Sequence, residues 1–116
     1  MNALGVSGEE MACAFLTARG HRVLERNWRG GHREIDLITR DAEGIHFVEV
    51  KARSRAEDLV GAIDAKKIKN LTKAAKKFLS SAGKRGEWSG EECFFDAVLI
   101  ARGEEPVYYS QAFLPF

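Results

Sequence analysis

The sequence has few of the residues that would tie it to an oxidising or membrane environment. Cys13 and Cys93 are its only cysteines, far apart and outside any CxxC or Cys/His cluster. We expect two reduced, buried thiols, with neither a disulfide nor a cysteine-based zinc site. No apolar run approaches the ~20 residues that span a membrane, and the N-terminal stretch lacks the layout of a signal peptide. We therefore expect a cytoplasmic protein with no membrane partner.

Nothing in the sequence divides the chain. It contains no internal repeat, low-complexity tract or linker. Its composition, 45% hydrophobic and 30% charged, is typical of a globular protein, and 116 residues can bury one core but not two. We expect a single domain over residues 1–116.

Charge is nearly balanced overall but unevenly distributed. The net charge is +1, yet residues 51–85 carry eleven Lys/Arg against three acids, which leaves seven against fourteen elsewhere. A strongly basic segment in a neutral protein indicates a surface that faces a polyanion. The alternative is a solvated helix face without a ligand.

Hydrophobic periodicity and turn residues predict seven elements. The first helix begins with a capping box formed by Ser7 and Glu10. The expected elements are a helix at 8–19, strands at 21–28, 33–40 and 45–53, a lysine-rich helix at 64–81, and strands at 93–101 and 107–113, the last one weak and at an edge. The order αβββαββ predicts an α/β fold with a mixed central sheet flanked by helices.

The hairpin 33–53 carries charged residues among apolar ones. A turn centred between Ala42 and Glu43 pairs residues whose numbers sum to 85. On one face this register sets Asp36 opposite Glu49 and Glu34 opposite Lys51. On the other face, it pairs the apolar residues Ile35 with Val50 and Leu37 with Val48.

Two carboxylates that face each other destabilise a sheet unless something neutralises them. A divalent cation such as Mg²⁺ favours carboxylate oxygens, and Lys51 on the same face would add positive charge beside it. Two alternatives remain open. The face could be a solvated surface with a weak Glu34–Lys51 ion pair, or Asp36 and Glu49 could share a proton.

The sequence resembles a nuclease superfamily. Asp36, twelve intervening residues and then Glu49-Val50-Lys51 are similar to the D…(D/E)-x-K signature of the restriction-endonuclease-like nucleases. The segments GEEMACAFLTARGHRVLERNWR, EIDLI, FVEVKAR, KKIKNLTKAAKKFL and FDAVLI follow the order seen in the UPF0102 (YraN-like) family. Its members are described as predicted endonucleases related to archaeal Holliday-junction resolvases.

The resemblance implies a fold and a set of site residues. The fold would be a restriction-endonuclease-like αβββαβ core. Asp36 and Glu49, with the backbone carbonyl of Val50, would hold Mg²⁺ or Mn²⁺, and Lys51 would be the catalytic lysine. Three other positions match family residues. Glu9 matches a glutamate that related nucleases bring to the site, and Glu34 matches the glutamate of the EID motif. Arg53 matches the arginine two residues after the catalytic lysine.

The sequence departs from the family pattern at two positions. Arg33 stands where glycine is common, and Phe94 stands where an arginine often precedes the Phe-Asp pair. The second departure leaves Asp96 without its usual neighbour.

Two functions from different classes fit this sequence. The first is a metal-dependent endonuclease that hydrolyses phosphodiester bonds in DNA. Lysines of the second helix would track the DNA backbone: Lys66, Lys69, Lys73 and Lys76. No base-reading motif is visible, so we expect structure-specific recognition of branched or damaged DNA. A homodimer would supply two sites for two strands. The second function is a non-catalytic nucleic-acid-binding module on a nuclease fold.

The three histidines are scattered along the sequence. His46 falls opposite Thr39 on the apolar face, where we expect a hydrogen-bonded structural histidine rather than a ligand. We expect His32 to be a loop residue.

Overall fold

The seven elements follow the predicted order. A computed structural model describes residues 7–31, 33–53, 65–101 and 103–112. The elements are α1 (Gly8–Ala18), β1 (Arg22–Gly30), β2 (Arg33–Asp41), β3 (Gly44–Arg53), α2 (Ala65–Lys84), β4 (Cys93–Ala101) and β5 (Val107–Tyr109). The first strand and α2 extend further than predicted, and β5 is shorter. Asp64, the first residue of the predicted second helix, and His32 lie outside the described residues. Among the described helices, neither is long and apolar enough to cross a membrane.

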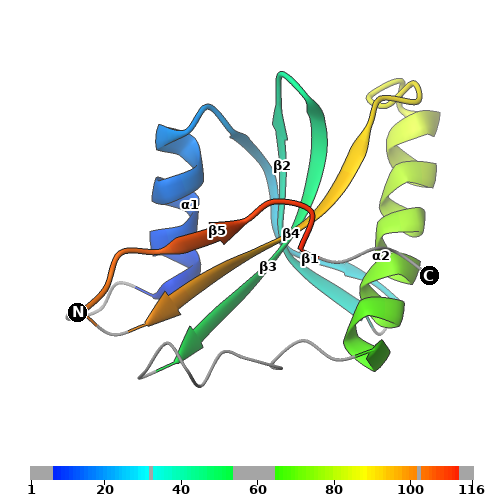
Figure 1. The fold of residues 1–116 in the computed structure, drawn as a ribbon. Coiled ribbons are helices and arrows are strands. Elements are labelled where there is room, and N and C mark those ends of the chain that lie inside the picture. Colours follow the sequence, from blue (N-terminus) through cyan, green and yellow to red (C-terminus); the bar gives the residue numbers. More distant parts are fainter. Residues whose placement is uncertain (1–6, 32, 54–64, 102, 113–116) are drawn as a thin grey trace.

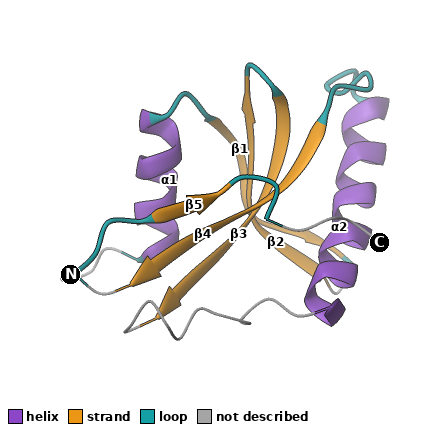
Figure 2. Ribbon diagram, in the orientation of Figure 1, coloured by secondary structure: helices purple, strands orange, loops and turns teal. Residues whose placement is uncertain are grey.

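The strands form one mixed sheet in the order β1-β2-β3-β4-β5. Neighbouring strands are antiparallel, except that β3 and β4 are parallel and α2 lies between them in the chain. Figure 1 shows α1 and α2 on opposite sides of this sheet, and Figure 2 shows β5 at its edge. The α/β prediction is confirmed, and this arrangement is compatible with a restriction-endonuclease-like αβββαβ core.

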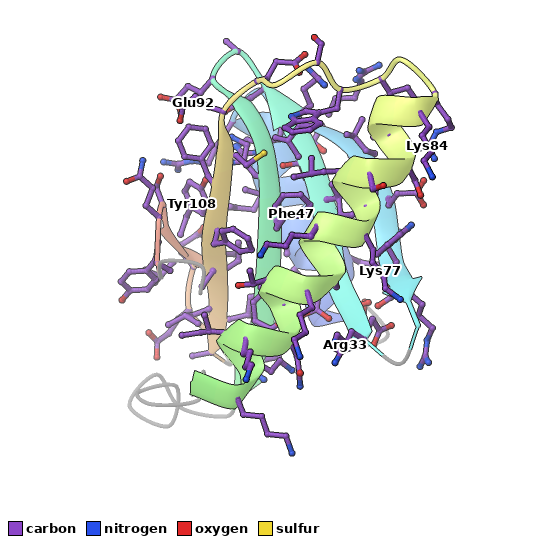
Figure 3. All side chains as sticks on the ribbon, turned by 90° about the vertical axis from the view of Figure 1, so that its right-hand side faces the viewer. Arg33, Phe47, Lys77, Lys84, Glu92 and Tyr108 are labelled. Carbon is purple, nitrogen blue, oxygen red and sulfur yellow. The ribbon has the colours of Figure 1, made fainter. Side chains whose placement is uncertain are left out.

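Each face of the sheet has its own hydrophobic cluster. The α1 side contains Ala12, Leu16, Leu37, Val48, Val98 and Ile100. The α2 side contains Ile35, Ile38, Ile45, Phe47, Leu71, Ala74, Ala75, Phe78, Ala82 and Phe95. In Figure 3, α2 lies in front of the sheet, with Phe47 beside it. Side chains alternate along a strand. Glu49 therefore points to the α2 side with Phe47, whereas His46 points to the α1 side with Val48.

Local signals at α1 act as predicted. The Ser7 hydroxyl accepts the Glu10 N–H at 3.1 Å, and the Glu10 carboxylate accepts the Ser7 N–H at 3.3 Å, which completes the capping box. Both cysteines are free, as expected, but Cys13 and Cys93 are half-buried rather than fully buried.

The hairpin register is confirmed over its turn-proximal half. Pairs whose numbers sum to 85 run from Asp41 and Gly44 to Leu37 and Val48. The predicted pairing of Ile35 with Val50 is wrong. Ile35 packs on the α2 side and Val50 on the α1 side. Ile35 and Leu37, two residues apart, thus face opposite sides, so β2 loses strict alternation at Asp36.

The β2–β3 turn depends on Gly44. Its φ is +148°, and a Cβ atom there would lie 2.2 Å from the Glu92 carbonyl oxygen. That carbonyl comes close because it accepts the Ile45 N–H at 2.9 Å.

We expect Gly44→Ala to lower the free energy of unfolding by about 3 kcal/mol or more, because a clash with backbone adds to conformational strain. The matched control is Gly86→Ala. Gly86 also has a positive φ, +75°, but nothing lies within 4 Å of its added Cβ, so strain alone should cost about 1–2 kcal/mol. Urea unfolding of both variants measures the difference, and equal losses would contradict the close approach.

Candidate active site

Glu49 is a buried carboxylate on the α2 side of β3. Only 1% of the residue is exposed. Its Oε2 atom lies 2.9 Å from Lys67 Nζ and 3.4 Å from Lys51 Nζ. Oε2 nevertheless makes no hydrogen bond of regular geometry within the described residues. Because two ammonium groups already approach this oxygen, a metal ion would have to share it with them or displace one of them.

Asp36 lies against Glu49 and ends the regular pairing of β2 with β3. Its Oδ2 accepts the Val50 N–H at 2.8 Å, so a side chain takes the place of a backbone partner where the ladder stops. The pKa of Asp36 is raised from 3.8 to about 7, chiefly by burial, then by the charge of Glu49 and a hydrogen bond with it, against the opposing effect of the Val50 N–H. Without metal, the raised pKa favours the protonated form of Asp36, which relieves the repulsion between the two groups.

Two ammonium groups compensate the pair from different elements. Lys51 follows Glu49 by two residues on β3 and points to the same side, and 16% of its side chain is exposed. Lys67 comes from the start of α2, with 44% of its side chain exposed. The contact with the Glu49 carboxylate raises the pKa of Lys67, which favours its cationic form.

Lys67 is the one residue of this cluster that sequence reasoning did not single out. A usable signal exists in the helical periodicity. Lys67 lies four residues before Leu71 and eight before Ala75, both buried against the sheet. It therefore continues the buried stripe of α2 over the acids, whereas the lysines chosen for DNA contact lie on the other faces of the helix.

The remaining predicted residues are distributed around the cluster. Glu9 is half-buried on α1, which covers the opposite face of the sheet, but its charge still raises the pKa of Asp36. Glu34 is exposed and pairs with Arg29 of β1, and the described β2–β3 ladder does not pair it with Lys51. Arg53 ends β3, and its side chain lies outside the described part of the structure. The lysines assigned to DNA are all exposed on α2: Lys66, Lys69, Lys73 and Lys76.

The positions that depart from the family pattern have distinct surroundings. Arg33 is half-buried at the start of β2. Phe94 stacks on the His46 ring, with centroids 4.9 Å apart. Asp96 is fully buried on the α1 side, where His46 binds it at 2.6 Å. Asp96 therefore belongs to the opposite face from Asp36 and Glu49.

A pocket of about 150 Å³ opens beside Asp36. It is lined by Arg33, Glu34, Asp36, Lys67, Asn70 and Leu71. A larger hollow of about 390 Å³ lies between β1 and the C-terminal half of α2, away from the carboxylates. The small pocket is the relevant one because it gives solvent access to Asp36 between β2 and the lysine-rich helix α2.

The donor set fits Mg²⁺ or Mn²⁺. Hard divalent cations bind through one or two carboxylates and keep several waters. Asp36 supplies a half-buried carboxyl group and Glu49 a buried oxygen without a regular hydrogen bond. Burial and then the negative charge of Glu49 raise the pKa of Asp36, and a divalent cation would neutralise the two carboxylates.

Comparison with known proteins identifies the family. The profile of the uncharacterised protein family UPF0102 matches residues 8–100. The chain belongs to the UPF0102 family. The resemblance noted in the sequence is thereby confirmed, and all the described residues of the carboxylate–lysine cluster fall inside the matched range.

Individual relatives agree with the assignment to UPF0102. A UPF0102 protein of Oleidesulfovibrio alaskensis is 43% identical over 109 residues, which cover 90% of this chain and 52% of the relative. A second, from Bradyrhizobium diazoefficiens, is 37% identical over 94% of this chain and 80% of the relative. A third, from Thermotoga maritima, is 45% identical over 61% of this chain and 66% of the relative. The match thus spans about half the length of the first relative.

The raised pKa of Asp36 in this UPF0102 protein makes stability depend on pH. Between about pH 4 and 7 the folded state binds a proton that the unfolded state has released, because the pKa rises from 3.8 to about 7 on folding. Asp36 therefore lowers the free energy of unfolding least at acidic pH and most above pH 7.

We expect Asp36→Asn, measured by urea unfolding with EDTA present, to stabilise the protein at pH 8. The advantage over the unsubstituted protein should shrink steadily toward pH 4.5, because the amide can still accept the Val50 N–H but carries no charge. An advantage that does not change with pH would contradict the raised pKa.

Proposed function

We propose that this UPF0102 protein is a metal-dependent endonuclease that hydrolyses phosphodiester bonds in DNA. One observation carries the proposal: Asp36 and Glu49 lie together with the Lys51 ammonium 3.4 Å from Glu49 Oε2. Opposed, buried acids beside a lysine cost stability, so their presence favours a chemical role over a structural one.

The chain's own groups have distinct roles in this proposal. Asp36, Glu49 and the Val50 carbonyl would hold Mg²⁺ or Mn²⁺. Bound there, the ion supplies Lewis-acid activation of the phosphate and a more acidic water. The Val50 N–H orients the Asp36 carboxylate. Lys51, less exposed and fixed on a strand, stabilises negative charge on the phosphate or positions the attacking water. Glu9 adds negative charge from α1 and Glu34 flanks the pocket.

Exposed lysines of α2 support a nucleic-acid substrate. Lys69, Lys73 and Lys76 are exposed on the helix whose first turn brings Lys67 to the acids. Figure 3 shows Lys77 and Lys84 projecting from the same helix. Phosphate contacts of this kind position a nucleic acid without reading its sequence. We propose Lys66 and Arg53 as further contacts, branched or damaged DNA as substrate, and a homodimer that offers two sites.

A non-catalytic DNA-binding module is the second candidate, and the Lys67–Glu49 contact favours it. At 2.9 Å, this ion pair already neutralises the buried carboxylate without a metal. In a pure binder it would be a permanent structural tie between α2 and β3. In the enzyme, Lys67 would leave Glu49 or contact phosphate when the cation binds.

We expect Glu49→Gln to reduce cleavage of branched or duplex DNA in Mg²⁺ or Mn²⁺ by at least about 100-fold, the upper end of what loss of a residue that only orients a metal ligand costs. DNA affinity should stay equal or become slightly tighter, because a negative charge near phosphate is removed. Gel assays of cleavage and binding measure both. The matched control, Glu104→Gln in an exposed loop, should cleave normally.

The binding-module function would replace the enzyme if purified protein binds DNA but cleaves no substrate form with either metal. The same conclusion follows if Glu49→Gln and Asp36→Asn cleave as well as the unsubstituted protein.

Combined replacement of Lys69, Lys73 and Lys76 by Ala tests the nucleic-acid surface under both functions. We expect weaker binding to all sequences and a flatter salt dependence, by about 0.9 in log–log slope for each phosphate that the variant no longer neutralises. Lys84→Ala, at the far end of α2, should change the slope less. Fluorescence anisotropy at several salt concentrations measures it, and an unchanged slope would remove α2 from the DNA interface.

A further inference from the structure

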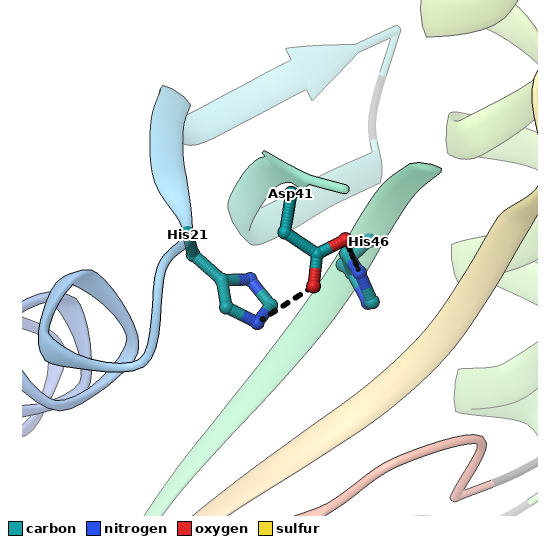
Figure 4. A group of neighbouring side chains, drawn as sticks. All are labelled: His21, Asp41 and His46. Carbon is teal, nitrogen blue, oxygen red and sulfur yellow. Dashed lines mark hydrogen bonds and ion pairs between the residues drawn. The ribbon is translucent and has the colours of Figure 1, made fainter. Parts of the chain in front are cut away.

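A second polar cluster lies on the α1 side of the sheet, opposite the carboxylate pair. His21 precedes β1, Asp41 ends β2 and His46 lies on β3. His21 is 6% exposed, His46 is 1% exposed, and 17% of the Asp41 side chain is exposed. Figure 4 shows the Asp41 carboxylate between the two imidazoles, with one ring at each oxygen. None of these residues takes part in the proposed nuclease chemistry.

Each of the three side chains offers one ligand atom, and these atoms lie close together. His46 Nε2 lies 2.8 Å from Asp41 Oδ1, and His21 Nε2 lies 3.5 Å from Asp41 Oδ2. The three ligand atoms lie within 4.8 Å of one another. Zinc ligands bind at about 2.0–2.2 Å, so only small side-chain shifts would be needed to admit an ion between them.

The second nitrogen of each ring is held by an oxygen. His46 Nδ1 lies 2.6 Å from Asp96 Oδ2, and His21 Nδ1 lies 2.7 Å from Thr39 Oγ1. Metal-binding histidines typically donate their other N–H to a carboxylate or similar acceptor, which fixes the tautomer and turns the free nitrogen to the metal.

The Asp96 carboxylate is itself fixed in its role as acceptor. The Tyr108 hydroxyl donates to its Oδ2, and the Gln111 N–H donates to its Oδ1 at 2.8 Å. With these donors on both oxygens, Asp96 is placed to accept the His46 Nδ1–H as well. His46 Nε2 then donates a proton to Asp41 Oδ1 when no metal is bound, and a metal ion at this nitrogen would replace that proton.

Charge balance favours a divalent ion over a proton. The carboxylates of Asp41 and Asp96 contribute two negative charges in a largely buried setting. A single proton shared with His46 leaves one negative charge, whereas a divalent cation with both imidazoles neutral leaves none. Net buried charge is costly, and the aromatic rings of Phe94 and Tyr108 beside the histidines keep this region apolar.

We propose that His21, Asp41 and His46 form a binding site for a divalent transition-metal ion of the Zn²⁺ class. Two imidazole nitrogens and one carboxylate suit zinc or similar ions, whereas magnesium prefers an all-oxygen set. The partly exposed Asp41 leaves a fourth position for water. The ion would join the start of β1 to the β2–β3 turn and thereby stabilise the α1 side of the sheet. The proposal does not depend on nuclease activity.

Titration of the metal-free full chain with Co²⁺, followed by visible absorption, tests the site. The Asp36→Asn/Glu49→Gln double variant serves as background, because it removes the competing carboxylate pair. We expect one equivalent of Co²⁺ to give the intense visible bands of low-coordinate, nitrogen-ligated cobalt. Zn²⁺ should abolish these bands and raise the unfolding temperature of the same protein.

Single substitutions in that background assign the ligands. We expect His21→Gln and His46→Gln each to weaken Co²⁺ binding by at least about 10–100-fold. If His46→Gln lowers the yield of folded protein, His21→Gln and Asp41→Asn supply the same test, because His21 and Asp41 are less buried than His46. The proposal is overturned if the double variant shows no cobalt bands, or if its bands and its thermal response to Zn²⁺ survive both His21→Gln and Asp41→Asn.

Discussion

The contact between the Asp36 and Glu49 carboxyl groups constrains the structure around it. Two neighbouring carboxyl groups in a buried setting cannot both be ionised without compensation, and each neighbouring feature reduces the repulsion. The Val50 N–H binds Asp36 where the β2–β3 ladder ends, and Lys51 and Lys67 approach Glu49 from β3 and α2. Alternation on β2 is lost at the same residue, which sends Ile35 into the α2-side cluster. The acidic pair thus shapes the backbone as well as the charge of the site.

The sheet separates two polar clusters of different chemistry. The α2 side holds oxygen ligands and ammonium groups, open to solvent through a small pocket and next to a helix with exposed lysines. The α1 side holds two imidazoles and a carboxylate, with second contacts to Thr39 and Asp96. Strand alternation on β3 produces this separation. Glu49 and His46 are three positions apart, so their side chains point to opposite faces of the sheet. Hard cations suit the first cluster and zinc-like ions the second.

Sequence patterns predicted the mixed sheet, the capping box and the register near the turn, because these depend on local periodicity and on residues close in the chain. That register also predicted Asp36 beside Glu49, although the β2–β3 pairing ends one pair earlier, at Leu37 and Val48. The predicted register failed at Ile35, because the backbone N–H of Val50 donates to the Asp36 side chain where regular pairing ends. Periodicity carries no information about such a bond. The contact of Lys67 with Glu49 could not be predicted from the sequence, because it depends on the angle at which α2 packs on the sheet. The cluster of His21, Asp41 and His46 could not be predicted either, because it depends on how β1, β2 and β3 are placed relative to one another. From the sequence alone, His46 was expected only as a structural histidine.

The most direct test of the central claim, that the acidic pair is built to receive a divalent cation, is a pH titration of the Asp36 carboxyl carbon by ¹³C NMR, with and without saturating Mg²⁺. Without metal, the carboxyl group should titrate near its raised pKa of about 7. With Mg²⁺ present, the account predicts a pKa well below that value, because the bound cation favours the ionised form. The same titration curve in both conditions would contradict the account.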